Sequence, residues 1–435
     1  MRDYLVFAII AVSAPIGLIR PYYGMLVYMW ISYMFPHELA WGFSRDLPGA
    51  KLASLSTVAG LLITRAGNTA SVFQRENILM IVLWCLFTMS SVFAFNPNLA
   101  WSKWMEISKL IIMALVTSTL LRDPKKIRYF FLVIALSLGF YGFKGGLFSL
   151  LTGGQERVWG PGTSVIAGNN AIGLALNMAL PFLWYLARQE TGYLSITLYS
   201  MFFLTVPAIM FTYSRASAFT LPIVLFAIMF RGKNRVLVLC TMLIGFILAF
   251  PFIPQKFWNR QNTALQYESD RSAMSRIDNW KFCWRLALDR PLTGGGFLFN
   301  TDRIFAMYAP EFLYSYGGTT WDTHNIYLAI LAAHGFPALF VFLLMIAFCF
   351  LSCRRLRRRV GSRADLVWMT SYCYTVEVSL LALLVNGIFV NMEYFELLYD
   401  LVAVVASLKV VGGRALSERP NESLRITNDL IPVTG

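Results

Sequence analysis

Histidine is rare in this chain of 435 residues. Of the three that occur, His324 stands where a polar stretch gives way to an apolar run (WDTHNIYL, 321–328). An imidazole with an ordinary pKa near ~6.5 can take a proton from a hydroxyl group at neutral pH. Its position fits an anchor at a membrane interface equally well. A metal ligand is disfavoured, because His334 would lie about 80° further around a helix and no histidines or cysteines at ligand spacing accompany it. We expect no metal and no cofactor.

Three arginines stand in polar segments that we expect on the same membrane face as His324. Arg215 interrupts two apolar runs (FTYSRAS), Arg157 lies in a glycine-rich stretch (GGQERVWGPGTS), and Arg276 lies in SRIDNWKFCWRLAL. A guanidinium group can form paired hydrogen bonds with phosphate oxygens. Each arginine alone could instead extend to the interface or into solvent. Their common face with His324 is what indicates a site for an anionic substrate.

Composition sets the environment of these residues. Hydrophobic residues make up 57% of the chain and form repeated long apolar runs. Such runs are typical of membrane-spanning helices, whereas the strands of a membrane barrel would alternate apolar and polar residues. The formal net charge is +14, but the basic residues cluster in short loops between the runs. This is the positive-inside pattern, so nucleic acid is not expected as a partner.

The charge pattern predicts an all-α polytopic membrane protein with about 12 transmembrane helices and both ends in the cytoplasm. Two crossings are expected near 4–19 and 21–35 and two within 367–411; the other eight are expected at 77–95, 105–121, 127–151, 166–187, 192–213, 216–231, 235–254 and 324–351. The segment 52–64 is short, which favours a re-entrant or interfacial segment and places Arg45 with Arg65 inside. Counting it as a crossing gives thirteen. Glu377, within an apolar run, is expected to make a helix–helix hydrogen bond.

The chain divides into four expected regions: transmembrane helices over 1–254, a periplasmic loop over 255–323, transmembrane helices over 324–411 and a flexible cytoplasmic tail over 412–435. Apolar residues at helical spacing in 275–288 predict an amphipathic helix at the membrane surface. The glycines at 294–296 are interpreted as a flexible turn, since they lack the Lys-Ser/Thr ending of a phosphate-binding loop. Gly335, eleven residues after His324, would permit close approach of another helix or a lipid chain.

These residues resemble the O-antigen ligase and Wzy-type polymerase family of bacterial inner-membrane glycosyltransferases. The resemblance covers most of 157–351 and rests on three features: the arginine in the short turn TYSRAS, the R-x-x-x-W stretch from Arg276 to Trp280 followed by Pro-Leu and glycines, and His324-Asn325 followed after nine residues by Gly335. Ala338 departs from the last place of the third motif, where the family has Gly, Thr or Tyr.

The resemblance implies a site at the periplasmic face of the bacterial inner membrane. Its donor would be a glycan on undecaprenyl diphosphate, and its acceptor a hydroxyl of lipid A-core oligosaccharide. His324 would be the base of an inverting, metal-independent transfer, while Arg215, Arg276 and Arg157 would bind the diphosphate. The residues expected to support this site are Asn325, Trp280, Tyr327 and Gly335. Membrane lipids are the remaining expected partner.

Other functions stay open at this stage. A polymerase and a protein O-oligosaccharyltransferase would use the same donor with a different acceptor. The N-terminal segments also resemble putative O-glycosylation ligases of exosortase systems, which leaves the acceptor open. A transporter of lipid-linked glycan is the non-enzyme alternative; it would place charges near the bilayer midplane and show internal repeats, which we do not find.

Overall fold

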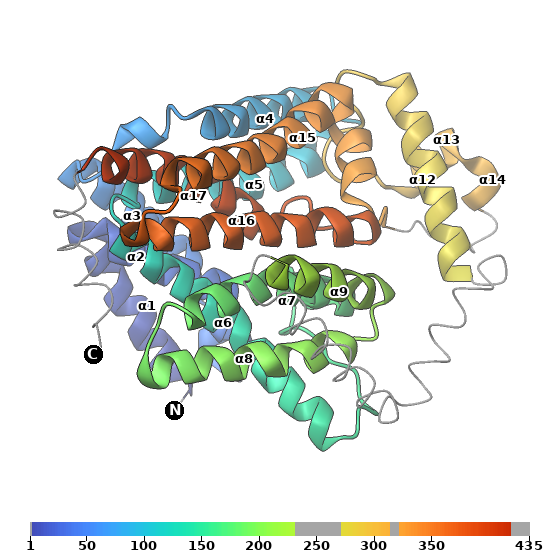
Figure 1. Cartoon of the computed structure of the whole chain (residues 1–435). Coiled ribbons are helices and arrows are strands. Elements are labelled where there is room, and N and C mark those ends of the chain that lie inside the picture. The colour runs from blue at the N-terminus through green and yellow to red at the C-terminus, as the bar shows by residue number, and fades with distance from the viewer. Residues whose placement is uncertain (1, 231–270, 314–321, 419–435) are drawn as a thin grey trace.

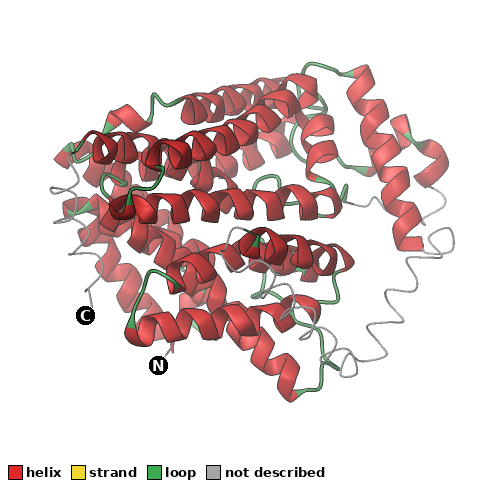
Figure 2. Cartoon of the chain, in the orientation of Figure 1, coloured by secondary structure: helices red, strands yellow, loops and turns green. Residues whose placement is uncertain are grey.

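The structure is a computed structural model that describes residues 2–230, 271–313 and 322–418. All regular structure in these ranges is helical, as expected (Figure 2). The expected crossing at 235–254 and parts of the expected loop and tail lie outside the described residues.

Seven segments in the described ranges are long and apolar enough to cross a membrane. They are α1 (Arg2–Ile19), α4 (Arg75–Val92), α6 (Pro124–Leu151), α7 (Asn169–Ala187), α8 (Gly192–Met210), α15 (Ile326–Val360) and the stretch Ala364–Phe389, which contains η7 (Ala364–Leu366), α16 (Val367–Asn386) and η8 (Gly387–Phe389). Five shorter or more polar helices pack among them: α2 (Pro21–Met34), α3 (Gly49–Thr64), α5 (Pro97–Leu120), α9 (Arg215–Met229) and α17 (Glu396–Ser417). The short helices η1 (Pro36–Leu39), η2 (Phe43–Asp46) and η3 (Thr69–Ser71) lie in connections.

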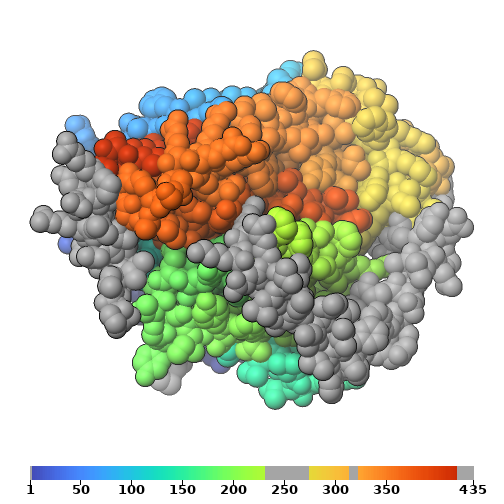
Figure 3. Space-filling view, viewed as in Figure 1, coloured from blue at the N-terminus to red at the C-terminus, as the bar shows by residue number. Residues whose placement is uncertain are grey.

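Three helices extend past one end of the bundle, drawn in yellow and light orange in Figure 1: α12 (Arg271–Asp289), α13 (Asp302–Tyr308) and α14 (Pro310–Leu313). They have a small apolar core of their own, in which Phe282, Cys283 and Leu286 of α12 are fully buried. Ala332 and Ala333 of α15 belong to the same core, so the core joins these helices to the bundle. Figure 3 shows α15 along one flank, with α12 continuing its surface. The helix predicted over 275–288 is therefore present within α12.

The N-terminal helices differ from expectation. The segment 52–64 belongs to a continuous helix, α3, which packs against α1 and α2; a Cβ on Gly60 would lie 2.1 Å from the carbonyl oxygen of Gly17. The missing side chain of Gly60 lets α3 approach the backbone of α1 closely. A prediction from hydropathy and segment length does not take such a contact into account.

The expected grouping of Arg45 with Arg65 also differs from the structure. Arg45 precedes α3 and pairs with Glu38 at 3.4 Å, and Glu38 accepts a hydrogen bond from Thr163 in the loop between α6 and α7. Arg65 follows α3, next to Ala66, whose carbonyl accepts a hydrogen bond from Arg122. The two arginines thus lie at opposite ends of α3. The carboxylate of Glu38 pairs with Arg45. Because its charge is compensated in this way, Arg45 need not lie on the cytoplasmic side, where the positive-inside rule places basic residues.

The expected tail begins inside a helix, because α17 continues to Ser417 rather than ending near 411. Gly412 packs against Met369, whose sulfur would lie 2.9 Å from an added Cβ. The helix–helix contact expected for Glu377 is confirmed: both of its oxygens accept hydrogen bonds from Arg357 of α15, at 2.7 and 3.0 Å.

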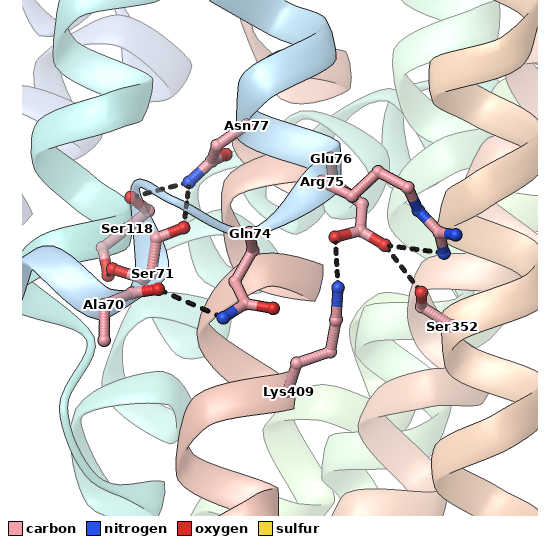
Figure 4. Close-up of polar contacts among 9 residues, drawn as sticks. All are labelled: Ala70, Ser71, Gln74, Arg75, Glu76, Asn77, Ser118, Ser352 and Lys409. Atoms are coloured by element: carbon pink, nitrogen blue, oxygen red, sulfur yellow. Dashed lines mark hydrogen bonds and ion pairs between the residues drawn. The ribbon is translucent and has the colours of Figure 1, made fainter.

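A buried carboxylate joins three helices at the end of the bundle remote from α12 (Figure 4). Glu76 of α4 is fully buried and accepts hydrogen bonds from Ser352 of α15 at 2.6 Å and from Lys409 of α17 at 2.7 Å. Arg75 lies 3.8 Å from the same carboxylate. A buried charge is tolerated only when it is paired and hydrogen-bonded, so these contacts fix the three helices together.

Replacing Lys409 by methionine should destabilise the protein by about 3 kcal/mol, because it leaves a buried carboxylate with too few partners. Adding Glu76→Gln to this variant should restore most of the loss. Removing the exposed partner in Arg45→Met should cost at most about 1 kcal/mol. Unfolding by SDS titration of protein in mild detergent measures all three. Equal losses in Lys409→Met and Arg45→Met would contradict the assignment.

Candidate active site

His324 lies at the mouth of α15 in a constrained backbone. Its φ is +48°, in the left-handed region that non-glycine residues seldom adopt. The next residue, Asn325, is the N-cap of α15, and its side chain accepts hydrogen bonds from the amides of Tyr327 at 2.9 Å and Leu328 at 3.0 Å. Strained backbone at a cap is characteristic of functional positions. The cap therefore fixes the backbone immediately after His324.

Two of the residues expected to support His324 contact its surroundings. Trp280 of α12 donates its indole N–H to the carbonyl of Thr323 at 2.9 Å. Tyr327 donates its hydroxyl to the carbonyl of Leu384 near the end of α16 at 2.6 Å. The turn that carries His324 is thus held from α12 on one side and from α16 on the other.

The electrostatic surroundings keep His324 neutral. Burial lowers the pKa of its half-buried imidazole, and the positive charge of Arg276 lowers it further; Asp322 opposes them. The charge of Arg276 on α12 is therefore near enough to act on His324. A neutral imidazole at neutral pH is the form that accepts a proton.

The glycines of 294–296 form part of the site's support rather than a flexible turn. Helix α15 is interrupted at Gly335, whose φ is +80° and ψ 179°. The break leaves carbonyl groups without helical partners, and the amides of Gly295 and Gly296 donate to Ala332 and Ala333, each at 2.8 Å. On the other side, the amide of Phe336 donates to the carbonyl of Pro291 at 2.8 Å.

The hydrogen bonds between residues 291–296 and the break in α15 form an interlock. The interlock explains why glycine is required at both Gly294 and Gly335. A Cβ on Gly335 would lie 2.5 Å from the carbonyl oxygen of Pro291, and a Cβ on Gly294 would lie 2.5 Å from that of Ala332. The expected close approach at Gly335 is therefore to the loop after α12, not to another helix or a lipid chain. Since α12 carries Arg276 and His324 lies just before α15, the interlock helps to set their relative position.

His334 is buried next to the break. Its Nδ1 lies 2.5 Å from the hydroxyl of Ser90 in α4, and its Nε2 lies 2.6 Å from the hydroxyl of Tyr394. These hydrogen bonds occupy both ring nitrogens of His334, which leaves it unsuited to act with His324.

Glu393 is a candidate residue that the sequence reasoning missed. It lies in the loop between η8 and α17; Asn391 of this loop accepts a hydrogen bond from the amide of Asn325 at 3.3 Å. Burial raises the pKa of Glu393 to about 7, and the negative charge of Asp322 adds to the rise. One of its carboxyl oxygens has no hydrogen-bond partner among the described residues. The polar break NMEYFE (391–396) in the apolar run was the available signal.

The loop that carries Arg157 packs against the turn that precedes Arg215. Arg215 is the first residue of α9, after the N-cap Ser214. The loop that carries Arg157 docks on the preceding turn: Tyr213 donates to the carbonyl of Gly154 at 2.5 Å. The charge of Arg157 acts on Tyr213, opposing the rise in pKa that burial causes there. Arg157 therefore lies beside the turn that leads into Arg215.

The end of α16 connects the two halves of the site. Asn386 donates to the hydroxyl of Ser217, two residues after Arg215, at 3.1 Å. The next residue, Gly387, packs against Ile326 at the start of α15. Arg215 and His324 thus lie at the same end of the bundle, on either side of this segment. Within the described ranges, no group of three or more His, Cys, Asp or Glu side chains could hold a metal ion.

Apolar helices long enough to span a bilayer, with polar groups gathered at one end, define an integral membrane protein. Residues 200–343 match the family described as O-antigen ligase, which supports membership of the O-antigen ligase superfamily. Residues 1–191 match a family of unknown function (DUF5935). No curated protein gives a significant match to the chain. Arg215, Arg276 and His324 lie within the ligase match, whereas Arg157 lies within the other.

Replacing Gly335 by alanine should destabilise the protein by about 1–3 kcal/mol from backbone strain alone, because its conformation is essentially restricted to glycine. The contact with Pro291 should add to this loss. Gly413→Ala is the matched control, since an added Cβ there meets nothing within 4 Å. Thermal unfolding in detergent measures both variants, and limited proteolysis with chymotrypsin should show added cleavage after Phe297 in Gly335→Ala alone. Indistinguishable behaviour of the two variants would refute the interlock.

Proposed function

We propose that this protein is an O-antigen ligase that transfers a glycan from undecaprenyl diphosphate to a hydroxyl group of lipid A-core oligosaccharide. The transfer takes place at the periplasmic face of the bacterial inner membrane. The observation that carries the proposal is the half-buried, neutral His324 under the charge of Arg276, within a segment that matches O-antigen ligases. The arginines Arg215 and Arg157 at the same end of the bundle support it.

In the proposed mechanism, His324 accepts the proton of the acceptor hydroxyl as its oxygen attacks the anomeric carbon of the donor. The new C–O bond forms while the bond from that carbon to the diphosphate oxygen breaks, and the configuration inverts. The electron pair of the broken bond stays on the diphosphate. The proton on the imidazole then passes to the departing diphosphate or to water.

The arginines supply the electrostatic part of this reaction. Negative charge grows on the diphosphate as the bond breaks, and guanidinium groups aimed at it lower the barrier. Arg276, Arg215 and Arg157 would do so, and the proposed transfer therefore needs no metal ion. Arg276 has a second effect, because its charge also keeps His324 unprotonated before the donor binds.

A polymerase or a protein O-oligosaccharyltransferase would use the same residues and differ only in the acceptor. A ligation assay with purified protein and lipid-linked donor separates them when lipid A-core, a non-reducing glycan end and a serine-containing acceptor protein are offered in turn. We expect transfer to lipid A-core.

The pH dependence of kcat/KM tests the base. Because the pKa of His324 is lowered, the wild-type enzyme should stay active below pH 6.5 and lose activity only at lower pH, as the imidazole becomes protonated. Arg276→Gln removes one of the charges that lower the pKa of His324. The acid limb of the pH profile of this variant should therefore shift upward, toward pH 6.5, in addition to any loss of rate. His324→Ala should lose about 10²–10⁴-fold. An unshifted limb in Arg276→Gln, or near-normal transfer by folded His324→Ala, would contradict this role.

The arginine at the start of α9 is tested in the same assay. Arg215→Ala should lower kcat about 10²–10³-fold, as removal of a charge-stabilising donor does elsewhere. Arg215→Lys should show a smaller defect, since it keeps the charge but not the paired geometry. Arg303→Ala, which removes an exposed arginine of α13, is the control and should transfer normally. Normal kinetics in Arg215→Ala would exclude it from the diphosphate site.

A further inference from the structure

A second cavity lies at the end of the bundle remote from His324. Its volume is about 440 Å³, and it is formed where α1 meets α2, where α3 ends and where α5 meets α6. No step of the proposed glycan transfer uses it. Its size is that of a small-ligand site.

The cavity is strongly positive. Its charged lining consists of four cations and one carboxylate: Arg20, Arg122, Lys125, Lys126 and Asp123. Asp123 caps α6 by accepting a hydrogen bond from the amide of Lys126 at 2.9 Å, and it lies 3.5 Å from the ammonium group of the same lysine. The lining residues therefore carry an excess of three positive charges, which favours an anionic ligand.

Contacts hold two of these cations, Arg122 and Lys126, in place. Arg122 donates to the carbonyl of Ala66 at 2.6 Å, which ties the end of α5 to the segment after α3. Tyr22 is buried and donates its hydroxyl to the carbonyl of Lys126 at 3.0 Å, and the ammonium of Lys126 lies 5.3 Å from its ring. The cavity thus has a preformed wall, which lowers the entropic cost of binding.

The surroundings of the cavity are apolar. The lining residue Ile19 is 71% exposed, and Leu62 and Ile63, just before the lining residue Thr64, are 73% and 72% exposed. Tyr23 and Tyr129, two half-exposed tyrosines, line the cavity itself. Large exposed apolar residues beside tyrosines and cations are the pattern of helix ends at a membrane–water interface. A ligand here would meet cations at its head and apolar side chains along its tail.

We propose that this cavity binds the headgroup of an anionic phospholipid, such as phosphatidylglycerol or cardiolipin. The phosphate lies among Arg20, Arg122 and Lys125, and the acyl chains lie along Ile19 and Ile63. The basic loops at this end belong to the cytoplasmic side by the positive-inside rule, and basic pockets between helices on that side suit such headgroups. A soluble phosphate would use the cations but gain nothing from the apolar flank.

Lipid retention by purified protein tests the proposal. Wild-type protein in mild detergent is titrated with phosphatidylglycerol, cardiolipin or phosphatidylethanolamine, and bound lipid is counted by native mass spectrometry. We expect the two anionic lipids to bind in preference to phosphatidylethanolamine. Arg20→Gln with Lys125→Gln should weaken anionic binding about 30-fold, as the loss of two surface cations implies.

A control with the same change in charge is available on the same side of the membrane. Arg355 and Arg358 are exposed on the last turns of α15 and do not line the cavity, so Arg355→Gln with Arg358→Gln should keep wild-type retention. A charge-keeping pair, Arg20→Lys with Lys125→Arg, should bind within a few-fold of wild type. Thermal unfolding of the cavity glutamine pair at the wild-type midpoint shows that its loss of lipid is not a folding defect.

Three outcomes would overturn the proposal. The first is equal retention in the wild type and the cavity glutamine pair. The second is equal loss in the cavity and α15 glutamine pairs, which would mean that overall charge alone attracts lipid. The third is displacement of bound lipid by inorganic diphosphate at equal concentration, which would mean that the acyl chains contribute nothing.

Discussion

The break in α15 at Gly335 is the constraint on which the rest of the site depends. A helix interrupted inside an apolar bundle must find partners for its freed carbonyl groups, because water is scarce there. The amides of Gly295 and Gly296 supply them. The segment that follows α12 is thereby locked into α15, and α12 is held beside the helix that carries His324. Without this interlock, Arg276 would have no fixed distance from the imidazole.

The same arrangement couples binding to chemistry. Arg276 lowers the pKa of His324 while the site is empty, which keeps the base free of a proton but also makes it weaker. In the proposed function, a diphosphate bound at Arg276 would bring negative charge that offsets this lowering. The base would then gain strength when the donor is in place. One cation can thus serve both the leaving group and the base, provided that it lies between them.

The sequence predicted the all-helical fold, the helix over 275–288 and the position of His324 at a helix mouth, because hydrophobic periodicity and polar breaks are local signals. It could not predict that 294–296 packs into the break at Gly335, since that depends on hydrogen bonds between distant segments. Glu393 was missed because its burial and raised pKa come from tertiary packing. The path of α3 beside α1 was missed because close glycine contacts carry no hydropathy signal.

Photocrosslinking with a donor analogue whose reactive group sits next to the diphosphate tests the central claim most directly. If the arginines and His324 surround that group, peptides containing Arg215 and His324 should both be labelled, and excess unmodified donor should prevent it. Labelling confined to peptides from the opposite end of the bundle, or to only one of these two segments at saturation, would contradict the account.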